Sequence, residues 1–204
     1  MNLSIKEIAQ KIGELNKQLS EKYAELSVKY GFSSSGSGKK IVFEKESRRK
    51  NKLFKIPAWK YAIPQSIRHL LSMPFIYMMI VPVLILDAFI TLYHTVAFPL
   101  YHIPKVKRKD FIVYDRQFLD YLNWIQKVNC VYCTYVGGLF AYCVEVAGRT
   151  ERYWCPVKAA HKPRFHHGWY SDFADYGSPE EWKEKFNNEN AFKDPNKKDE
   201  NCKL

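Results

Sequence analysis

The first thirty residues alternate apolar and charged positions with the spacing of an amphipathic helix. Charged residues of both signs fill the positions between the apolar ones, and Lys22 stands where the apolar pattern lapses. The apolar positions lie three or four residues apart, at Ile5, Ile8, Ile12, Leu15, Leu19, Leu26 and Tyr30. So narrow a seam predicts a coiled coil, or a helix docked on a protein partner or on a second copy, over residues 1–30. The alternative is an amphipathic helix packed on its own chain.

A break in this pattern follows at residues 31–38. Gly31 is placed to end the helix, and Ser33–Gly38 contains only serine and glycine, which predicts a flexible linker. The next segment, residues 39–69, carries ten Lys or Arg and two Glu, interleaved with aromatic residues. Such a mixture binds either anionic lipid or nucleic acid. Because an apolar stretch follows at once, we predict anionic membrane lipid and expect no specific nucleic acid.

The longest apolar stretch covers residues 70–104 and predicts a segment inserted in a membrane. Leu70–Leu86 carries no charge over 17 residues, and Ala88–Ile103 carries only two histidines over 16. An apolar helix crosses the bilayer core with roughly 20 residues, so the stretch is long for one span and short for two. Pro74 and Pro82 favour kinks in its first half.

The two flanks of this stretch are both basic, and basic residues favour the cytoplasmic side of a membrane. A single span would place either Lys39–Arg68 or Lys105–Lys109 on the wrong side. We therefore predict a membrane-inserted hairpin or kinked helix, with the soluble parts in the cytoplasm. A single span and a buried pair of core helices are the alternatives.

Three ionisable residues interrupt the apolar stretch. Asp87 would cost about 2.5–3.5 kcal/mol at the centre of a membrane helix, so we predict that it lies in a hairpin turn or a helix cap. An ion or proton site is the alternative. His94 and His102 are predicted to lie at the interface as polar tips, with haem or quinone binding as the alternative.

Residues 110–194 form a second candidate domain, which we predict to be helical. Tyr132–Val146 is mostly apolar, although Gly137 and Gly138 weaken it, and Gly148 is predicted to end that helix. Ser178-Pro179 starts another helix, with Ser as the cap and Pro at the first position. Residues 195–204, which include Cys202, are polar and predicted to be disordered. The predicted fold class is thus mainly α.

The cysteines supply the only constellation with recognisable chemistry. Cys130-x-x-Cys133 and Cys155 provide three ligands for a tetrahedral zinc ion. Cys155 precedes Pro156, which is suited to open a helix, and a helix N-terminus favours the thiolate. His161 is predicted as the fourth ligand.

Cys143 is the other candidate for the fourth ligand. If residues 130–146 form one helix, it lies about 140° around the axis from Cys130 and belongs to the core. A break at Gly137-Gly138 would instead allow four cysteines and an iron–sulfur cluster. A redox dithiol of Cys130 and Cys133, or purely structural cysteines, are further alternatives. His166 and His167 are predicted to pack among aromatic residues, with metal or acid–base chemistry as the alternative.

Composition indicates what kind of partner the protein binds and in which cellular compartment its cysteines lie. The net charge of +11 and the 16% of aromatic residues suit a negatively charged, interfacial partner. The chain has no apolar leader near its start and an odd number of cysteines, five, so we expect a reducing, cytoplasmic setting for the thiols. It contains no phosphate loop, nucleophile elbow, His-Glu-x-x-His or dinucleotide fingerprint, which favours a protein that is not an enzyme.

The cysteine motifs also carry a resemblance. Tyr121-Leu122-Asn123, Cys130-Val131-Tyr132-Cys133 and the run Arg149–Lys158 with its Tyr-Trp-Cys-Pro resemble a family of uncharacterised bacterial membrane-associated proteins over residues 114–176. The resemblance implies a bacterial inner-membrane protein and no established activity. Members of that family place a His shortly after the Cys-Pro, whereas Ala159 and Ala160 stand there in this chain. This departure leaves the fourth ligand open.

The sequence leads to two hypotheses. The first is a membrane-anchored, cytoplasm-facing adaptor or accessory subunit with a structural metal. The second is an electron-transfer or thiol-redox component that uses Cys130 and Cys133.

Overall fold

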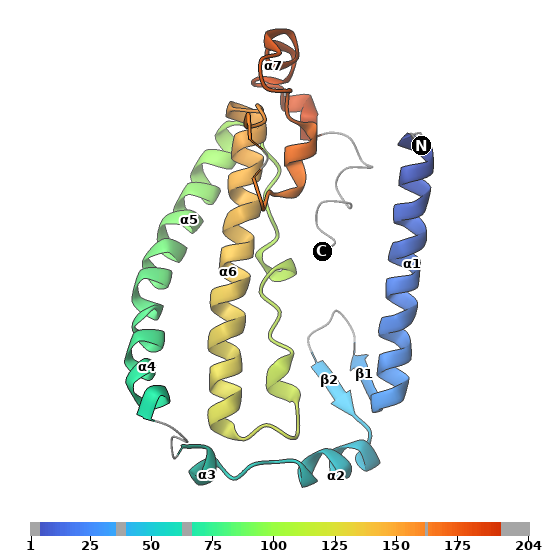
Figure 1. Cartoon of the computed structure of the whole chain (residues 1–204), viewed down its shortest axis with the longest axis vertical. Coiled ribbons are helices and arrows are strands. Elements are labelled where there is room, and N and C mark those ends of the chain that lie inside the picture. The colour runs from blue at the N-terminus through green and yellow to red at the C-terminus, as the bar shows by residue number, and fades with distance from the viewer. Residues whose placement is uncertain (1–4, 36–39, 63–66, 162, 193–204) are drawn as a thin grey trace. The chain divides into compact units, whose positions relative to one another are not determined.

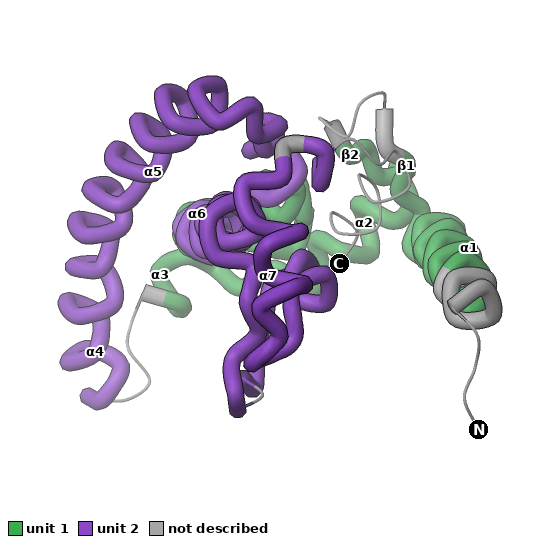
Figure 2. Tube along the Cα trace, turned by 90° about the horizontal axis from the view of Figure 1, so that it is seen from above, with its two compact units in different colours: residues 1–63, 114–131 green, residues 64–113, 132–204 purple. Residues whose placement is uncertain are grey.

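Helices dominate the chain, as the predicted fold class requires (Figure 1). The computed structural model describes residues 5–35, 40–62, 67–161 and 163–192. The chain forms two compact units, which are described separately below (Figure 2). Unit 1 comprises residues 1–63 and 114–131, and unit 2 comprises residues 64–113 and 132–204. Each unit therefore combines segments that are far apart in the sequence.

Unit 1 begins with the predicted amphipathic helix, α1 (Ile5–Tyr30). Gly31 ends it, as predicted, with φ of 61°, a left-handed conformation that glycine adopts without strain. Strand β1 (Phe32–Ser35) then pairs antiparallel with β2 (Lys40–Phe43). The prediction of a flexible linker is thus wrong for residues 32–35, whereas residues 36–38 lie outside the described part.

A pair of aromatic rings accounts for this hairpin. Phe32 lies opposite Phe43 in the strand register, and the two ring centroids are 5.8 Å apart. Cross-strand aromatic pairs stabilise two-stranded sheets, and the serines between them tolerate an extended backbone. The linker prediction considered the serines and glycines and overlooked the flanking aromatic residues.

The basic segment of unit 1 forms two short helices, α2 (Lys45–Leu53) and α3 (Ala58–Ala62). Arg48 of α2 bonds both carboxylate oxygens of Asp120, at 3.2 and 3.3 Å. Asn123 donates to the carbonyl of Ile56. It also caps the last long helix through reciprocal 2.9 Å hydrogen bonds with Gln126. These contacts join residues 48–56 to the segment 116–126.

Unit 2 begins with α4 (Ile67–Met78) and α5 (Ile80–Leu100). Met79 between them keeps helical backbone angles, so the two form one bent helix of 34 residues, called α4–α5 below (Figure 1). Pro82 lacks the N–H that would bond back to the preceding turn, which favours the bend. Of the two predicted forms, the structure therefore contains the kinked helix and not the hairpin.

Helix α6 (Trp124–Trp154) has 31 residues and runs through Gly137, Gly138 and Gly148 without a break. The prediction that Gly148 ends the helix is wrong. Gly138 and Gly148 allow other chain segments to approach the helix closely. A β-carbon on Gly138 would lie 2.7 Å from the carbonyl oxygen of Phe111, and one on Gly148 would lie 2.7 Å from the ring of His167. The helix ends instead just before Pro156.

Within unit 2, α5 and α6 run in the same direction. Asp87 contacts Tyr135, and Tyr93 further along α5 contacts Thr150 further along α6. Residues 101–113, called the return segment below, lead back in the opposite direction beside α6 (Figure 1). Pro104 therefore contacts Arg149, whereas Phe111 lies against Gly138. The return segment contains the short 3-10 helix η1 (Arg108–Asp110).

The core of unit 2 lies between α5, the return segment and α6. Its fully buried side chains include Val83, Phe98, Leu139, Val146 and Phe173.

Beyond α6 the chain forms η3 (Gly168–Asp172), α7 (Pro179–Lys185) and η4 (Glu189–Phe192), and residues 157 and 174 form an isolated parallel bridge. Helix α7 starts at Pro179 after Ser178, as predicted, but the Ser178 side chain makes no capping hydrogen bond, and Glu181 accepts from the N–H of Asp175. The predicted disordered tail, residues 195–204 with Cys202, lies outside the described residues.

Candidate functional site

The described residues contain two helices that are long and apolar enough to cross a membrane, α4–α5 and α6. Helix α4–α5 is almost wholly apolar; all residues of α4 are exposed, and two opposite faces divide α5. One face, called the outer face below, is exposed along its whole length: Phe89, for example, is 68% exposed and Leu71 65%. The outer face consists of Leu71, Phe75, Met78, Ile85, Phe89, Leu92 and Val96. These residues recur every three or four positions, with one step of seven between Met78 and Ile85, and so lie along one stripe of the helix.

The opposite face of α5, called the inner face below, packs on the rest of unit 2. It consists of Val83, Asp87, Ile90, His94 and Phe98. The acidic and the basic side chain of α5, Asp87 and His94, both lie on this face. A helix that is apolar all round, with its polar groups turned to its own protein, meets the requirements of a helix in lipid.

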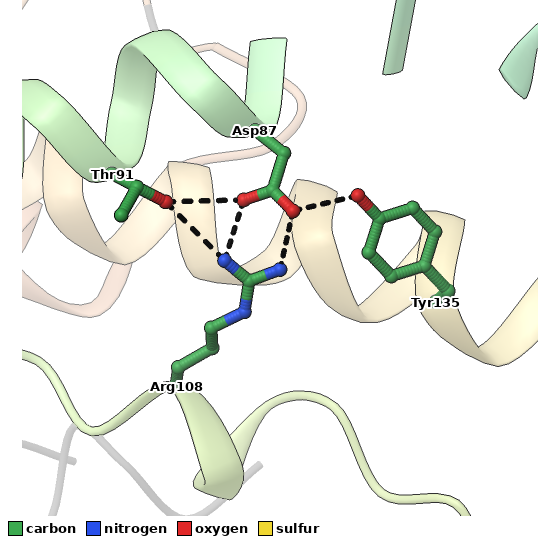
Figure 3. A network of polar contacts seen from close by, with 4 residues as sticks. All are labelled: Asp87, Thr91, Arg108 and Tyr135. Atoms are coloured by element: carbon green, nitrogen blue, oxygen red, sulfur yellow. Dashed lines mark hydrogen bonds and ion pairs between the residues drawn. The ribbon is translucent and has the colours of Figure 1, made fainter. Parts of the chain in front are cut away.

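Asp87 is the centre of a polar network on the inner face (Figure 3). Arg108 of the return segment donates from Nη1 to Oδ1 and from Nη2 to Oδ2, which makes a two-pronged ion pair. Tyr135 of α6 donates to Oδ2 at 2.6 Å, and Thr91 donates to Oδ1 at 3.2 Å. The hydrogen bonds that Arg108 donates to Asp87 raise the pKa of Arg108 and hold the pair in its charged form.

This network corrects the prediction for Asp87, which placed it in a turn or a cap. Asp87 lies in the interior of α5, where its charge is balanced by Arg108. Arg108 and Tyr135 were not singled out from the sequence. A signal was nevertheless present, because a lone carboxylate in an apolar stretch requires a cation, and Arg108 belongs to the basic cluster that follows.

His94 is buried on the same face, so the prediction of an interfacial polar tip is wrong for it. Its Nε2 accepts a 2.9 Å hydrogen bond from the backbone N–H of Val106 in the return segment. Its ring also lies edge-on to Phe98 and Tyr142, at 4.6 and 5.7 Å between centroids. The contacts give His94 a structural role, in which it fixes the return segment against α5. His102, by contrast, is exposed.

A second buried polar cluster joins α6 to the segment that follows it. Glu145 accepts from Arg149 Nε at 2.7 Å and from Trp169 Nε1 at 3.0 Å, on the same oxygen. Arg149 also donates to the carbonyl of Pro104 at 2.8 Å and lies over the Trp169 ring. The charges of Glu145 and Arg149 are thus paired inside the core, which gives the cluster a structural role.

The predicted metal ligands do not gather at one point of unit 2. Cys133 lies near the start of its part of α6, and Cys155 lies just beyond the last residue of that helix. The two positions are 22 residue steps apart, which corresponds to roughly 33 Å along a continuous helix. No group of three or more His, Cys, Asp or Glu side chains suited to a metal occurs among the described residues. Cys130 and Cys133 remain one turn apart on α6.

The other predicted features of this constellation have mixed outcomes. Cys155 does not open a helix: its N–H bonds to the carbonyl of Glu151, at the C-terminal end of α6. His161 is exposed. Cys143 packs against the core of unit 2, as predicted.

The two adjacent histidines pack among aromatic rings, which confirms the packing interpretation. His166 stacks on Tyr170 at 5.0 Å, and His167 lies 5.3 Å from Phe173. His167 also bonds to Glu151 at 3.1 Å. These contacts hold the segment after Cys155 against the end of α6.

No family model, characterised protein or solved structure matches this chain. The resemblance to a bacterial membrane-associated family therefore stays a prediction.

Proposed function

We propose that the protein is a membrane-anchored adaptor or accessory subunit, attached to the bilayer through the outer face of α4–α5. The observation that carries the proposal is the division of α5 into two faces, together with the exposed apolar surface of α4. Seven apolar side chains are exposed on the outer face, while Asp87 and His94 are bonded to other groups on the inner face. Lipid acyl chains suit the outer face because they have no polar groups to satisfy.

Water alone would be a poor environment for this surface. Soluble monomers rarely expose a large continuous apolar patch, and such patches mark membrane or protein contacts. The ion pair of Asp87 with Arg108 removes the main obstacle to lipid contact, which is an unpaired charge on the helix.

The basic segment of unit 1 supports an anionic lipid partner. Leu53, Phe54 and Trp59 are exposed beside the lysines and arginines of α2 and α3. Exposed aromatic and aliphatic side chains among basic residues favour the interface of an anionic membrane. The basic flanks favour the cytoplasmic side of the inner membrane for both units.

The adaptor part of the proposal rests on α1. The side chains of Leu15, Leu19 and Leu26, which belong to the predicted seam, are exposed in unit 1. Their exposure favours a seam that binds a partner helix or a second copy over one that packs within unit 1. The side chains of Ile5, Ile8 and Ile12 lie outside the described set. A structural metal is not part of the proposal, because Cys133 and Cys155 lie too far apart to share an ion.

Flotation with vesicles of phosphatidylglycerol and phosphatidylcholine tests the membrane attachment. We expect the purified protein to float with the vesicles, and alkaline carbonate to leave it on cell membranes. Phe89→Asp places a charge on the outer face, so binding should fall at least about tenfold, which corresponds to ~1.4 kcal/mol. Val113→Asp is the matched control, since Val113 is an exposed apolar residue of unit 2 outside this helix. Equal loss in both variants, or no flotation of the wild type, would contradict the proposal.

A further inference from the structure

We infer that α4–α5 lies in the plane of the membrane, with its outer face immersed in one leaflet, and does not cross the bilayer. The inference rests on the proposed function, namely that the outer face binds lipid, and it specifies how the helix does so. Three features of unit 2 carry it: the direction of the helices, the lysines of the return segment, and the length of α4–α5.

The direction of the helices argues against crossing. Because α5 and the part of α6 in unit 2 run the same way, a protein that crossed with both would have to return through the bilayer between them. The return segment leads back beside both helices, and its residues 103–107 have no regular secondary structure. Irregular backbone is not found in the lipid-exposed hydrocarbon region, where every N–H and C=O needs an internal partner.

The lysines of the return segment give a second reason. Val106 and Arg108 point inward to His94 and Asp87, and so they fix this stretch beside the middle of α5. The residues that alternate with them, Lys105, Lys107 and Lys109, are exposed. A crossing α5 would carry these three charges into the bilayer core, where lysine is among the most costly residues to insert. An in-plane helix leaves them at the level of the phosphates.

The length of the helix gives a third reason. Its 34 residues extend for about 51 Å, whereas the hydrocarbon core is about 30 Å thick. A crossing that kept the whole apolar helix in lipid would require a tilt of roughly 54°, beyond the range of about 0–40° seen for membrane helices. A helix that lies in the plane has no such limit on its length.

The in-plane position also explains why α4–α5 lacks a polar face. A helix that lies alone at an interface exposes one polar side to water. In α5 that side is replaced by the inner face, which α6 and the return segment cover. Helix α5 is therefore apolar on both sides, because one side contacts protein and the other contacts acyl chains.

The test measures the depth of the outer face at four points along the helix. Leu71, Met78, Ile85 and Leu92 lie seven residues apart on that face, and all four are exposed. Each is replaced by cysteine in a full-length protein whose native cysteines are serine, and labelled with bimane. The protein is bound to phosphatidylglycerol and phosphatidylcholine vesicles whose lipids carry a nitroxide quencher either near the headgroup or near the chain end.

An in-plane helix should lose bimane fluorescence to the same extent at all four positions, with the shallow quencher the more effective. A quenching ratio that changes along the helix, with the deep quencher more effective in the middle, would overturn the inference while leaving membrane attachment intact. Lack of quenching at every position would overturn the proposed function itself. Lys107→Cys serves as the control. It should react with an impermeant maleimide added outside the vesicles, and its protection would indicate a crossing helix.

The unmodified protein provides a second measurement if the cysteine-free variant does not fold. The amide I transition of a helix lies close to its axis, and α4–α5 and α6 run the same way in unit 2. Polarised infrared spectra of the wild type in supported bilayers should therefore show amide I absorption mainly in the membrane plane. Absorption mainly along the membrane normal would overturn the inference.

Discussion

The Arg108 guanidinium donates hydrogen bonds to both carboxylate oxygens of Asp87, and this contact joins the return segment to the middle of α5. The hydroxyl of Tyr135 completes the site from α6. Three segments of unit 2 thus meet at one carboxylate, with its neighbour Thr91 as a further donor (Figure 3). A lone acidic residue in an apolar helix is tolerated here because both of its carboxylate oxygens accept hydrogen bonds from other segments of unit 2.

Removal of Asp87 should therefore destabilise unit 2. Asp87→Ala leaves the half-buried guanidinium of Arg108 without its partner, and we expect a loss of about 2 kcal/mol in the free energy of unfolding. This value lies between those of exposed and fully buried ion pairs. Chemical unfolding in mild detergent measures it. The double variant Asp87→Ala, Arg108→Ala should lose clearly less than the sum of the two single changes, and strict additivity would show that the pair contributes nothing.

The glycine pair in α6 supplies a matched comparison of two adjacent sites. A β-carbon at Gly138 would meet the backbone oxygen of Phe111 at 2.7 Å and the Cα of Ile112 at 3.0 Å, whereas one at Gly137 would meet nothing within 4 Å. Gly138→Ala should cost about 1–3 kcal/mol through overpacking, because the atoms it meets include backbone that cannot rotate away. Gly137→Ala should instead stabilise the helix by about 0.5–1 kcal/mol. Thermal unfolding of the two variants distinguishes them, and an equal effect would mean that the return segment does not lie against Gly138.

The cluster around Glu145 should depend both on its ion pair with Arg149 and on its hydrogen bond from Trp169. Glu145→Ala leaves Arg149 buried without a counter-charge and removes the acceptor of the Trp169 N–H, so we expect a loss of about 3 kcal/mol. Glu145→Gln keeps an acceptor oxygen and should lose roughly half as much. Unfolding in denaturant measures both. A glutamine variant as unstable as the alanine variant would show that the ion pair, and not the hydrogen bond to Trp169, dominates the cluster.

Much of the helical architecture was predictable because it depends on local patterns. The seam of residues 1–30, the stop at Gly31 and the start at Ser178-Pro179 all follow from spacing and capping, which act within one turn of helix. The kinked helix α4–α5 was among the predicted forms because a proline inside an apolar helical stretch is also a local signal. Gly148 was misread because glycine weakens a helix only when nothing compensates, and here His167 packs where a side chain would be.

The candidate site was less predictable because it depends on contacts between distant segments. Asp87 attracts attention in the sequence, but its partners Arg108 and Tyr135 lie 21 and 48 residues away on other elements. The spacing of the cysteines suggested that Cys155 returns to Cys133. Such a return requires the helix to end between the two cysteines. Helix α6 instead continues through its glycines and keeps Cys133 and Cys155 apart.

The thiols should behave independently of one another. Cys133 and Cys155 are exposed at the two ends of their part of α6, whereas Cys143 packs against the core. In protein purified in detergent, a water-soluble maleimide should label Cys133 and Cys155 readily and Cys143 slowly, with the same rates before and after a chelator is added. A zinc site formed by Cys130, Cys133, Cys155 and His161 would protect both reactive thiols until the metal is removed. Joint release by the chelator would therefore restore the metal prediction and contradict the structure of α6.

The exposed seam of α1 should set the association state of the protein. Leu19 lies on the seam, and an aspartate there would place a charge between two packed helices. If the seam binds a second copy, Leu19→Asp should weaken that association by about 30-fold or more, which corresponds to ~2 kcal/mol, as measured by sedimentation in mild detergent. Ala24→Asp is the matched control, because residue 24 is exposed on the face away from the seam and gains the same charge. If both variants and the wild type sediment as monomers, self-association is excluded. The seam would then be available only to a different protein, whose co-purification should be lost in Leu19→Asp and kept in Ala24→Asp.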